Sequence, residues 1–351
     1  MSSAIETQNL FHRYGRTEAV HDLTLTVPTG SIFALLGPNG AGKTTTIKVL
    51  MNLLAPTSGS ARILGTDSRK LRERDRARIG YVSENQQLPL WMTVRQLLDY
   101  CRPFYPTWDR DLEKKLLTRF ALPPDRKLKH LSRGMLMKAS LLSSLAYRPK
   151  LLVLDEPFSG LDPLVRDEFI HGVLETSAAG EWTVLVSSHD IAEIEQLADH
   201  VAILDAGRLK LSEPTESLQS RFRRIELTLP APHEPSRTHE HPSTHERAGS
   251  HERQRVDSAA SSSAQPRPLS PAHSALQLPT SSFNSAGLPA TWLAFERTGS
   301  LARFIDTRFD PAKTETTCRT HFPDAQVTAH PMTLREIFVT LARDSRPAIP
   351  A

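Results

Sequence analysis

The sequence has little cysteine and no long apolar run. Its only cysteines, Cys101 and Cys318, lie far apart and outside any metal-ligand spacing. This pattern argues against a disulfide framework and fits a reducing compartment. No stretch approaches the roughly 18 consecutive apolar residues of a transmembrane helix, and no apolar signal-peptide core follows the first residue. We therefore expect a cytoplasmic protein that needs a separate partner to act at a membrane.

The sequence also lacks a strong excess of either charge. Lysine and arginine together number 43 and the acidic residues 39, which gives a formal net charge of +4 without a long basic run. A nucleic-acid partner is therefore not expected. Hydrophobic residues make up 39% of the 351 residues, enough for a globular core in two or three domains or subdomains.

The most informative motif is GPNGAGKTT at residues 37–45, directly after the apolar run 32–36. It matches the G-x-x-x-x-G-K-[ST] phosphate loop, whose glycines let backbone N–H groups surround a polyphosphate. Lys43 adds a charge at the β- and γ-phosphates, and the Thr44 hydroxyl can ligate Mg²⁺. The predicted nucleotide-binding residues here are Gly37, Pro38, Asn39, Gly40, Ala41, Gly42, Lys43, Thr44 and Thr45.

Apolar periodicity outlines the first 221 residues. Strands are predicted near residues 5–11 and 23–27, and a helix at 43–54 after the phosphate loop. Residues 86–147 read as a helical block, with helices at 94–102, 109–120 and 132–147. Strands return at 151–154, 183–187 and 201–204. A helix at 163–176 joins the first two of these and predicts a βαβ unit in a parallel sheet.

The pattern changes after residue 222. A strand at 224–229 is followed by a segment, 230–289, that is rich in proline and serine and is predicted to be a disordered insertion. His239, His241 and His245 could ligate a metal there, but disorder is the favoured reading. Order returns with a segment at 292–297, a helix at 302–309, a strand at 326–329 and an amphipathic helix at 333–342.

A second motif, LLVLDE, ends the strand that begins at Leu151. Asp155 can hold Mg²⁺ opposite the phosphate loop, and Glu156 is the candidate general base for an attacking water. Together with the phosphate loop, this pair predicts nucleotide hydrolysis.

With these two motifs and those that follow, the chain resembles the ATP-binding cassette family. Within that family it is similar to the ATP-binding subunit of an ABC transporter of exporter-like bacterial type. LSRGM at 131–135 is similar to the family signature LSGGQ, although Arg133 and Met135 depart from it. The resemblance implies that Ser132 and Gly134 reach ATP bound by the other subunit. It also implies that the D-loop, ending at Asp162, crosses the dimer interface.

Three further positions are identified through the same resemblance. His189, in VSSHD, matches the switch histidine that senses the γ-phosphate. Glu84, in IGYVSE, stands where the family has Gln, and its carboxylate could contact Mg²⁺ or the lytic water. Tyr14 matches the aromatic residue that stacks on adenine.

The resemblance implies an α/β fold: a P-loop NTPase cassette with an inserted helical subdomain (about 86–147) and an antiparallel β subdomain, in residues 1–221. Residues 222–229 and 290–345 would form a small α+β appendage. ATP and Mg²⁺ are the implied cofactors. The implied partners are a second ABC ATPase subunit, an identical chain, and an integral membrane permease that holds the ATPase on the cytoplasmic face, with export as the direction.

Some alternatives stay open at this level. The apolar residues Leu88–Met92, with Phe104, Tyr105 and Trp108, either dock a membrane-protein helix or form the core of the helical block. The chain could also be a soluble ABC-type ATPase acting on ribosomes or DNA. Glu84 and Arg133 leave room for a regulatory cassette that does not hydrolyse ATP.

Overall fold

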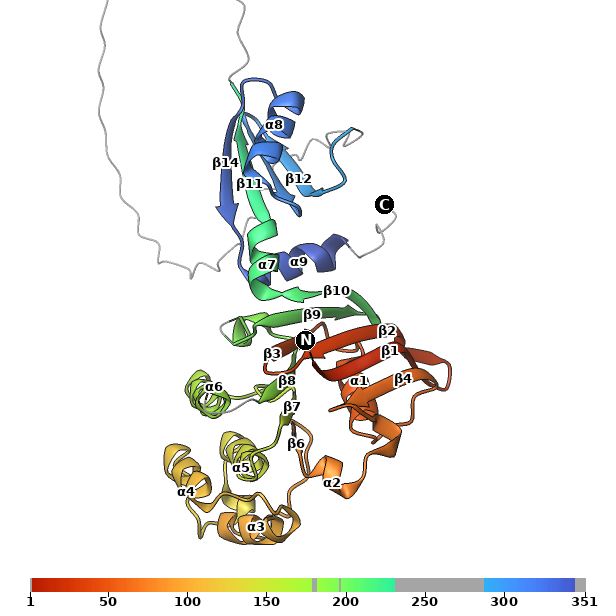
Figure 1. Ribbon diagram of the computed structural model, residues 1–351. Coiled ribbons are helices and arrows are strands. Elements are labelled where there is room, and N and C mark those ends of the chain that lie inside the picture. The colour runs from red at the N-terminus through yellow and green to blue at the C-terminus, as the bar shows by residue number, and fades with distance from the viewer. Residues whose placement is uncertain (1, 179–181, 196, 231–286, 345–351) are drawn as a thin grey trace, which may run out of the picture.

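The computed structural model describes residues 2–178, 182–195, 197–230 and 287–344. Figure 1 shows a helical block at one end, a C-terminal sheet at the other, and a central sheet between them. The predicted insertion at 230–289 falls almost entirely on residues 231–286, outside the described residues. Among the described residues, no helix is long and apolar enough to cross a membrane.

The central sheet has six strands in the order β10-β9-β3-β8-β7-β6. All neighbours are parallel except the antiparallel edge pair β10–β9. Three inner strands are buried at every position, as expected of strands covered on both faces; they are β3 (Ile32–Leu36), β7 (Leu151–Asp155) and β8 (Thr183–Ser188). The others are β6 (Ile79–Ser83), β9 (His200–Asp205) and β10 (Arg208–Pro214).

An antiparallel sheet, β2-β1-β4-β5, packs beside the central sheet and shares a hydrophobic core with helix α1. Its strands are β1 (Ser3–Tyr14), β2 (Thr17–Pro28), β4 (Ser58–Ile63) and β5 (Thr66–Asp67). The first two contain the strands predicted from the sequence. The sequence pattern did not indicate β4 and β5, which are short and mostly polar.

Helix α1 (Lys43–Leu50) is shorter than the predicted 43–54. Asn52 adopts the left-handed conformation, with φ of 56°. The Leu53 N–H then donates to the Lys48 carbonyl at 2.8 Å, which is the hydrogen bond of a Schellman motif at a helix C-terminus. Apolar residues continue past this point, so the periodicity alone overestimated the helix.

The helical block contains the three predicted helices, α3 (Val94–Cys101), α4 (Arg110–Arg119) and α5 (Arg133–Leu145). A side-chain oxygen of the preceding residue caps each one: Thr93, Asp109 and Ser132. The block shares one core with α6 (Pro163–Ala178), which joins β7 to parallel β8 and completes the predicted βαβ unit. Shorter helices are α2 (Glu73–Arg76) and the 3-10 turns Ser68–Lys70, Arg102–Phe104, Leu128–His130 and Ile191–Glu193 (η1–η4).

The C-terminal sheet has the order β12-β13-β11-β14 and a small core of its own. Its strands are β11 (Arg223–Thr228), β12 (Trp292–Thr298), β13 (Leu301–Asp306) and β14 (Gln326–Pro331). The predicted helix at 302–309 is wrong, because Ala302, Phe304 and Asp306 are buried in strict alternation with more exposed neighbours. Helix α8 (Pro311–His321), which covers this sheet, was not predicted.

The last helix, α9 (Leu334–Asp344), matches the predicted amphipathic helix and contacts both β12 of the C-terminal sheet and the cassette. Leu334 and Ile337 are fully buried in the same core as Ile191 and Ile194 of the cassette. The Leu334 N–H also donates to Glu195 Oε1 at 2.6 Å. Figure 1 shows α9 between the C-terminal sheet and β10, beside α7 (Thr215–Arg221).

Candidate active site

The backbone between β3 and α1 has a shape that only glycine allows at several positions. Gly40 and Gly42 have φ of +83° and +99°, in the left-handed region. A Cβ at Gly37 would lie 2.3 Å from the Leu204 carbonyl oxygen, and one at Gly42 would lie 2.3 Å from the Ala19 carbonyl oxygen. The predicted phosphate loop is therefore a tight turn held between β9 and β2, at the N-terminus of α1.

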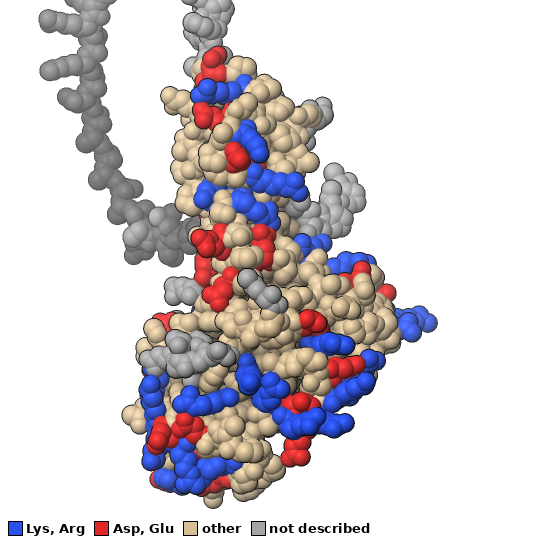
Figure 2. All heavy atoms as spheres, in the orientation of Figure 1, with Lys and Arg blue, Asp and Glu red and all other residues tan. Residues whose placement is uncertain are grey.

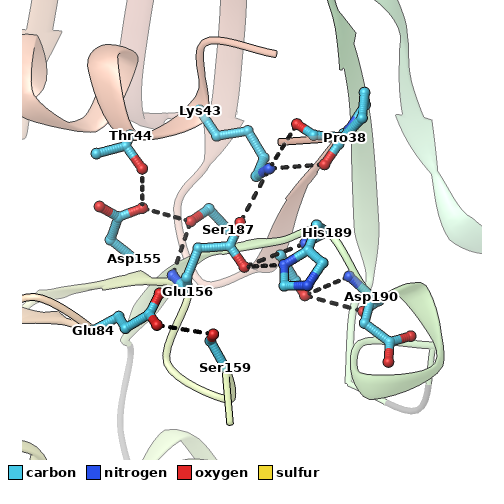
Figure 3. A network of polar contacts seen from close by, with 12 residues as sticks. Pro38, Lys43, Thr44, Glu84, Asp155, Glu156, Ser159, Ser187, His189 and Asp190 are labelled. Atoms are coloured by element: carbon cyan, nitrogen blue, oxygen red, sulfur yellow. Dashed lines mark hydrogen bonds and ion pairs between the residues drawn. The ribbon is translucent and has the colours of Figure 1, made fainter. Parts of the chain in front are cut away.

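Lys43 brings a buried charge into this loop; its side chain is 5% exposed. Its Nζ donates to the Gly37 carbonyl at 2.7 Å and to the Pro38 carbonyl at 3.2 Å. It also lies 3.0 Å from Glu156 Oε1 (Figure 3). A buried ammonium needs such oxygen partners, and phosphate oxygens could replace them when a nucleotide binds.

Asp155 accepts two hydroxyl hydrogen bonds at the end of β7. Thr44 Oγ1 donates to Asp155 Oδ1 at 3.0 Å, and Ser187 Oγ donates to the same atom at 2.8 Å (Figure 3). The residue is 3% exposed, and this burial is the main reason why the pKa of its carboxyl is raised. Carboxylate and hydroxyl oxygens are the ligands that Mg²⁺ prefers, so Thr44 and Asp155 fit the predicted metal role.

Glu156 occupies an uncommon backbone conformation, with φ of +51°. Its N–H donates to Ser187 Oγ at 3.1 Å. Its Oε1 faces Lys43, while Oε2 accepts from the His189 N–H at 3.3 Å and lies 2.7 Å from His189 Nδ1. The strained turn thus aims one carboxylate between the phosphate-loop lysine and the predicted switch histidine (Figure 3).

Glu84 lies beside this cluster, at the end of β6. Its N–H donates to the Asp155 carbonyl at 3.0 Å. Its Oε1 accepts from Ser159 Oγ at 2.9 Å and from the guanidinium of Arg133. The structure therefore brings the predicted Glu84, Asp155 and Glu156 together at the carboxyl ends of neighbouring parallel strands.

Four predicted residues lie on other elements and make their contacts outside this cluster. Ser132 Oγ accepts from the Met135 N–H at 3.2 Å and caps α5, while Asp162 Oδ1 accepts from the Val165 N–H at 3.0 Å and caps α6. Gly134 packs closely, since a Cβ there would lie 2.8 Å from Val165 Cγ1. Tyr14 is 47% exposed and presents its ring edge-on to a neighbouring histidine at 4.7 Å.

The sequence reading missed Ser187, which joins Asp155 to the backbone of Glu156. A signal was available: Ser187 falls opposite Asp155 in the β7–β8 register, two residues before His189. A polar residue at the end of a buried parallel strand could therefore have been assigned to the same edge of the sheet.

The apolar residues beside Glu84 fall into two groups, one that belongs to the core of the helical block and one that is exposed and could dock a partner. Met92 is buried in the core, and Leu88 and Trp108 pack against that core, so these are not free for docking. Trp91 is 67% exposed, and Leu90 and Phe104 are about half exposed. Figure 2 shows acidic and basic side chains interspersed over the visible face.

Comparison with known proteins agrees with this geometry. Residues 20–159 match a protein-family model described as ABC transporter. The chain is 34% identical over 226 residues to the bacitracin transport ATP-binding protein BcrA of Bacillus licheniformis, covering 64% of this chain and 74% of that protein. It is 38% identical over 222 residues to the daunorubicin/doxorubicin resistance ATP-binding protein DrrA of Streptomyces peucetius, covering 62% and 67%.

The relatives also include a protein whose name states import. The sulfate/thiosulfate import ATP-binding protein CysA of Escherichia coli (strain K12) is 31% identical over 224 residues, covering 61% of each chain. Among solved structures, an ATP-binding subunit of an ABC transporter superposes with a TM-score of 0.56 at 29% identity, covering 62% of this chain and 92% of that one. With the fold described above, these similarities show that the chain belongs to the family of ATP-binding subunits of ABC transporters, which are ATPases.

Proposed function

We propose that this chain is the ATP-hydrolysing subunit of an exporter, working as a dimer of identical chains on the cytoplasmic face of a separate membrane permease. The observation that carries the proposal is the division of the predicted residues into two groups. Lys43, Asp155, Glu156 and His189 form one bonded cluster, whereas Ser132 and Gly134 begin a helix outside it. Two head-to-tail copies would bring the second group of one chain to the first group of the other.

Within one chain, the cluster accounts for binding and hydrolysis. The phosphate-loop N–H groups and Lys43 bind the β- and γ-phosphates. Thr44 and Asp155 would hold Mg²⁺, with Glu84 nearby; the metal would neutralise charge on the phosphates. Glu156, freed from Lys43 by the nucleotide, orients a water and accepts its proton on the carboxylate. His189 holds Oε2 of this base and stands next to the phosphates.

Transport would follow from ATP-dependent closure of the dimer. The closed pair is favoured only while the γ-phosphate bridges the two chains, so hydrolysis lets them separate. The helical block would transmit this motion through its exposed apolar residues, Leu90, Trp91 and Phe104, to a membrane-protein helix. Export is supported by the bacitracin-transport and drug-resistance relatives and by the small α+β appendage that the exporter-like resemblance implies.

The test is an affinity pull-down from membranes. A tagged Glu156→Gln chain, held with Mg-ATP to prevent turnover, is extracted in mild detergent and its partners are identified. A protein with many membrane helices is expected to co-purify in a stoichiometric amount. Adding Trp91→Asp to the tagged chain is expected to lower the amount of that protein recovered. Leu53→Asp, which changes a side chain of similar exposure away from the helical block, is the matched control. Recovery of ribosomes, DNA or no membrane protein would contradict the proposal.

A further inference from the structure

Two of the positions at which this chain departs from the family motifs contact each other. Glu84 stands where the resemblance expects Gln, and Arg133 stands where it expects Gly; their side chains form an ion pair. Glu84 Oε1 also accepts from Ser159 Oγ at 2.9 Å. One carboxylate therefore joins three loops: the end of β6, the start of α5 and the loop after β7.

Arg133 also lies directly on the backbone of the loop after β7. Gly160 has φ of +68°, and a Cβ there would lie 2.7 Å from Arg133 Nη1 and 3.1 Å from its Cζ. A side chain at position 160 would force the guanidinium to move, and the left-handed φ would strain any residue other than glycine there. The arginine thus fixes the start of α5, with Ser132 and Gly134 on either side of it, against the loop that carries Asp162.

The pair is placed where it can open. Arg133 is 52% exposed and Glu84 is 27% exposed, so water can take over either charge at modest cost. Glu84 is anchored to the metal side of the pocket, since its N–H donates to the Asp155 carbonyl at 3.0 Å. Both side chains also line a cavity of about 100 Å³ between the β6–α3 loop and α5, together with Leu88, Leu90 and Met137.

We propose that Glu84 and Arg133 form a latch that holds the start of α5 and the loop after β7 to the metal side of the chain's own pocket before nucleotide binds. Arg133 and a Mg²⁺ held by Thr44 and Asp155 compete for the Glu84 carboxylate. If the carboxylate turned to the metal, Arg133 would be released, and Ser132 and Gly134 would become free to meet the second copy. This inference rests on the site residues of the proposed function, and it names Arg133 as a positioning residue.

A double-mutant cycle tests the competition. Four purified proteins are compared, all carrying Glu156→Gln to prevent turnover: the parent, Arg133→Met, Glu84→Gln and the double variant. A fluorescent ATP analogue reports binding while Mg²⁺ is titrated. Because exposed ion pairs are weak, Arg133→Met is expected to lower the half-saturating Mg²⁺ concentration about threefold when Glu84 is present. In the Glu84→Gln background the same change is expected to have an effect of less than about 1.5-fold.

A second measurement needs neither metal nor nucleotide. Hydrogen exchange of the metal-free protein is expected to quicken in residues 83–87 and 131–135 for Arg133→Met, but little for Arg133→Lys, which keeps the charge. Equal Mg²⁺ shifts in both backgrounds, or unchanged exchange in Arg133→Met, would overturn the latch. Neither measurement involves the permease, so a failed membrane pull-down leaves this test intact, and a failed latch leaves Mg²⁺-dependent ATP binding in place.

Discussion

Replacement of Ile337 by alanine tests whether α9 is structurally part of the ATPase. Ile337 is fully buried, and it belongs to the same hydrophobic core as Ile191 and Ile194, just after the predicted switch histidine. The C-terminal sheet has a separate core. A cavity made at Ile337 is therefore expected to destabilise the cassette rather than the C-terminal sheet alone.

The size of the effect follows from the lost side chain. Truncating a fully buried isoleucine to alanine costs about 2–5 kcal/mol. In a cooperative unit of about 200 residues, 1 kcal/mol moves the melting temperature by about 2–4 °C. A loss near 3 kcal/mol thus predicts a fall of about 6–12 °C. Differential scanning calorimetry with and without Mg-ADP identifies the cassette as the transition that nucleotide raises.

Val339 provides the control on the same helix, because its side chain is 39% exposed. Val339→Ala is expected to move the nucleotide-sensitive transition by no more than about 2 °C, since partly exposed positions carry little stability. If Ile337→Ala left that transition within about 1 °C of the parent and shifted only a second one, α9 would belong energetically to the appendage, and the shared core would be refuted.

Three further outcomes are expected. Gly134→Ala should lower the free energy of unfolding by about 1–3 kcal/mol, because the alanine Cβ would lie 2.8 Å from Val165 Cγ1. Adding Val165→Ala should restore the melting temperature but not the ATPase rate. Burial raises the pKa of the Asp155 carboxyl, so ionising this group destabilises the folded chain. The destabilisation is absent below the ordinary pKa of 3.8 and reaches its full size once the pH has passed the raised pKa. Asp155→Asn should therefore raise the melting temperature more at pH 8 than at pH 4, which is close to the ordinary pKa of 3.8, in calorimetry, while Mg²⁺-dependent ATP binding is lost. Tyr14→Ala should weaken ATP binding about three- to tenfold by fluorescence titration, and Tyr14→Phe much less.

Much of the site follows from the sequence because the contributing segments are local. The phosphate loop is contiguous, and Asp155 and Glu156 directly follow a buried run. Parallel strands also end at one edge of a sheet, so the chemistry of β3, β7 and β8 had to converge there. Helices α3, α4 and α5 were found for a similar reason, since periodicity and a capping residue are both local signals.

What the sequence could not supply depends on pairing across long separations. The segment 302–309 has apolar residues compatible with either period, and only its place between β11 and β12 selects the strand. The amphipathic character of α9 was visible, but its place in the same core as Ile194 was not. Likewise, Glu84 and Arg133 each departed from a motif, and only the fold shows that the two departures form an ion pair.

The most direct test of the account is the mass of the Glu156→Gln chain in solution, measured by size-exclusion chromatography with light scattering. The proposed mechanism requires two copies to enclose ATP that cannot be hydrolysed. A dimer is therefore expected in Mg-ATP and a monomer in Mg-ADP. The same monomeric mass in both nucleotides would contradict the claim that ATP is held between two copies of this chain.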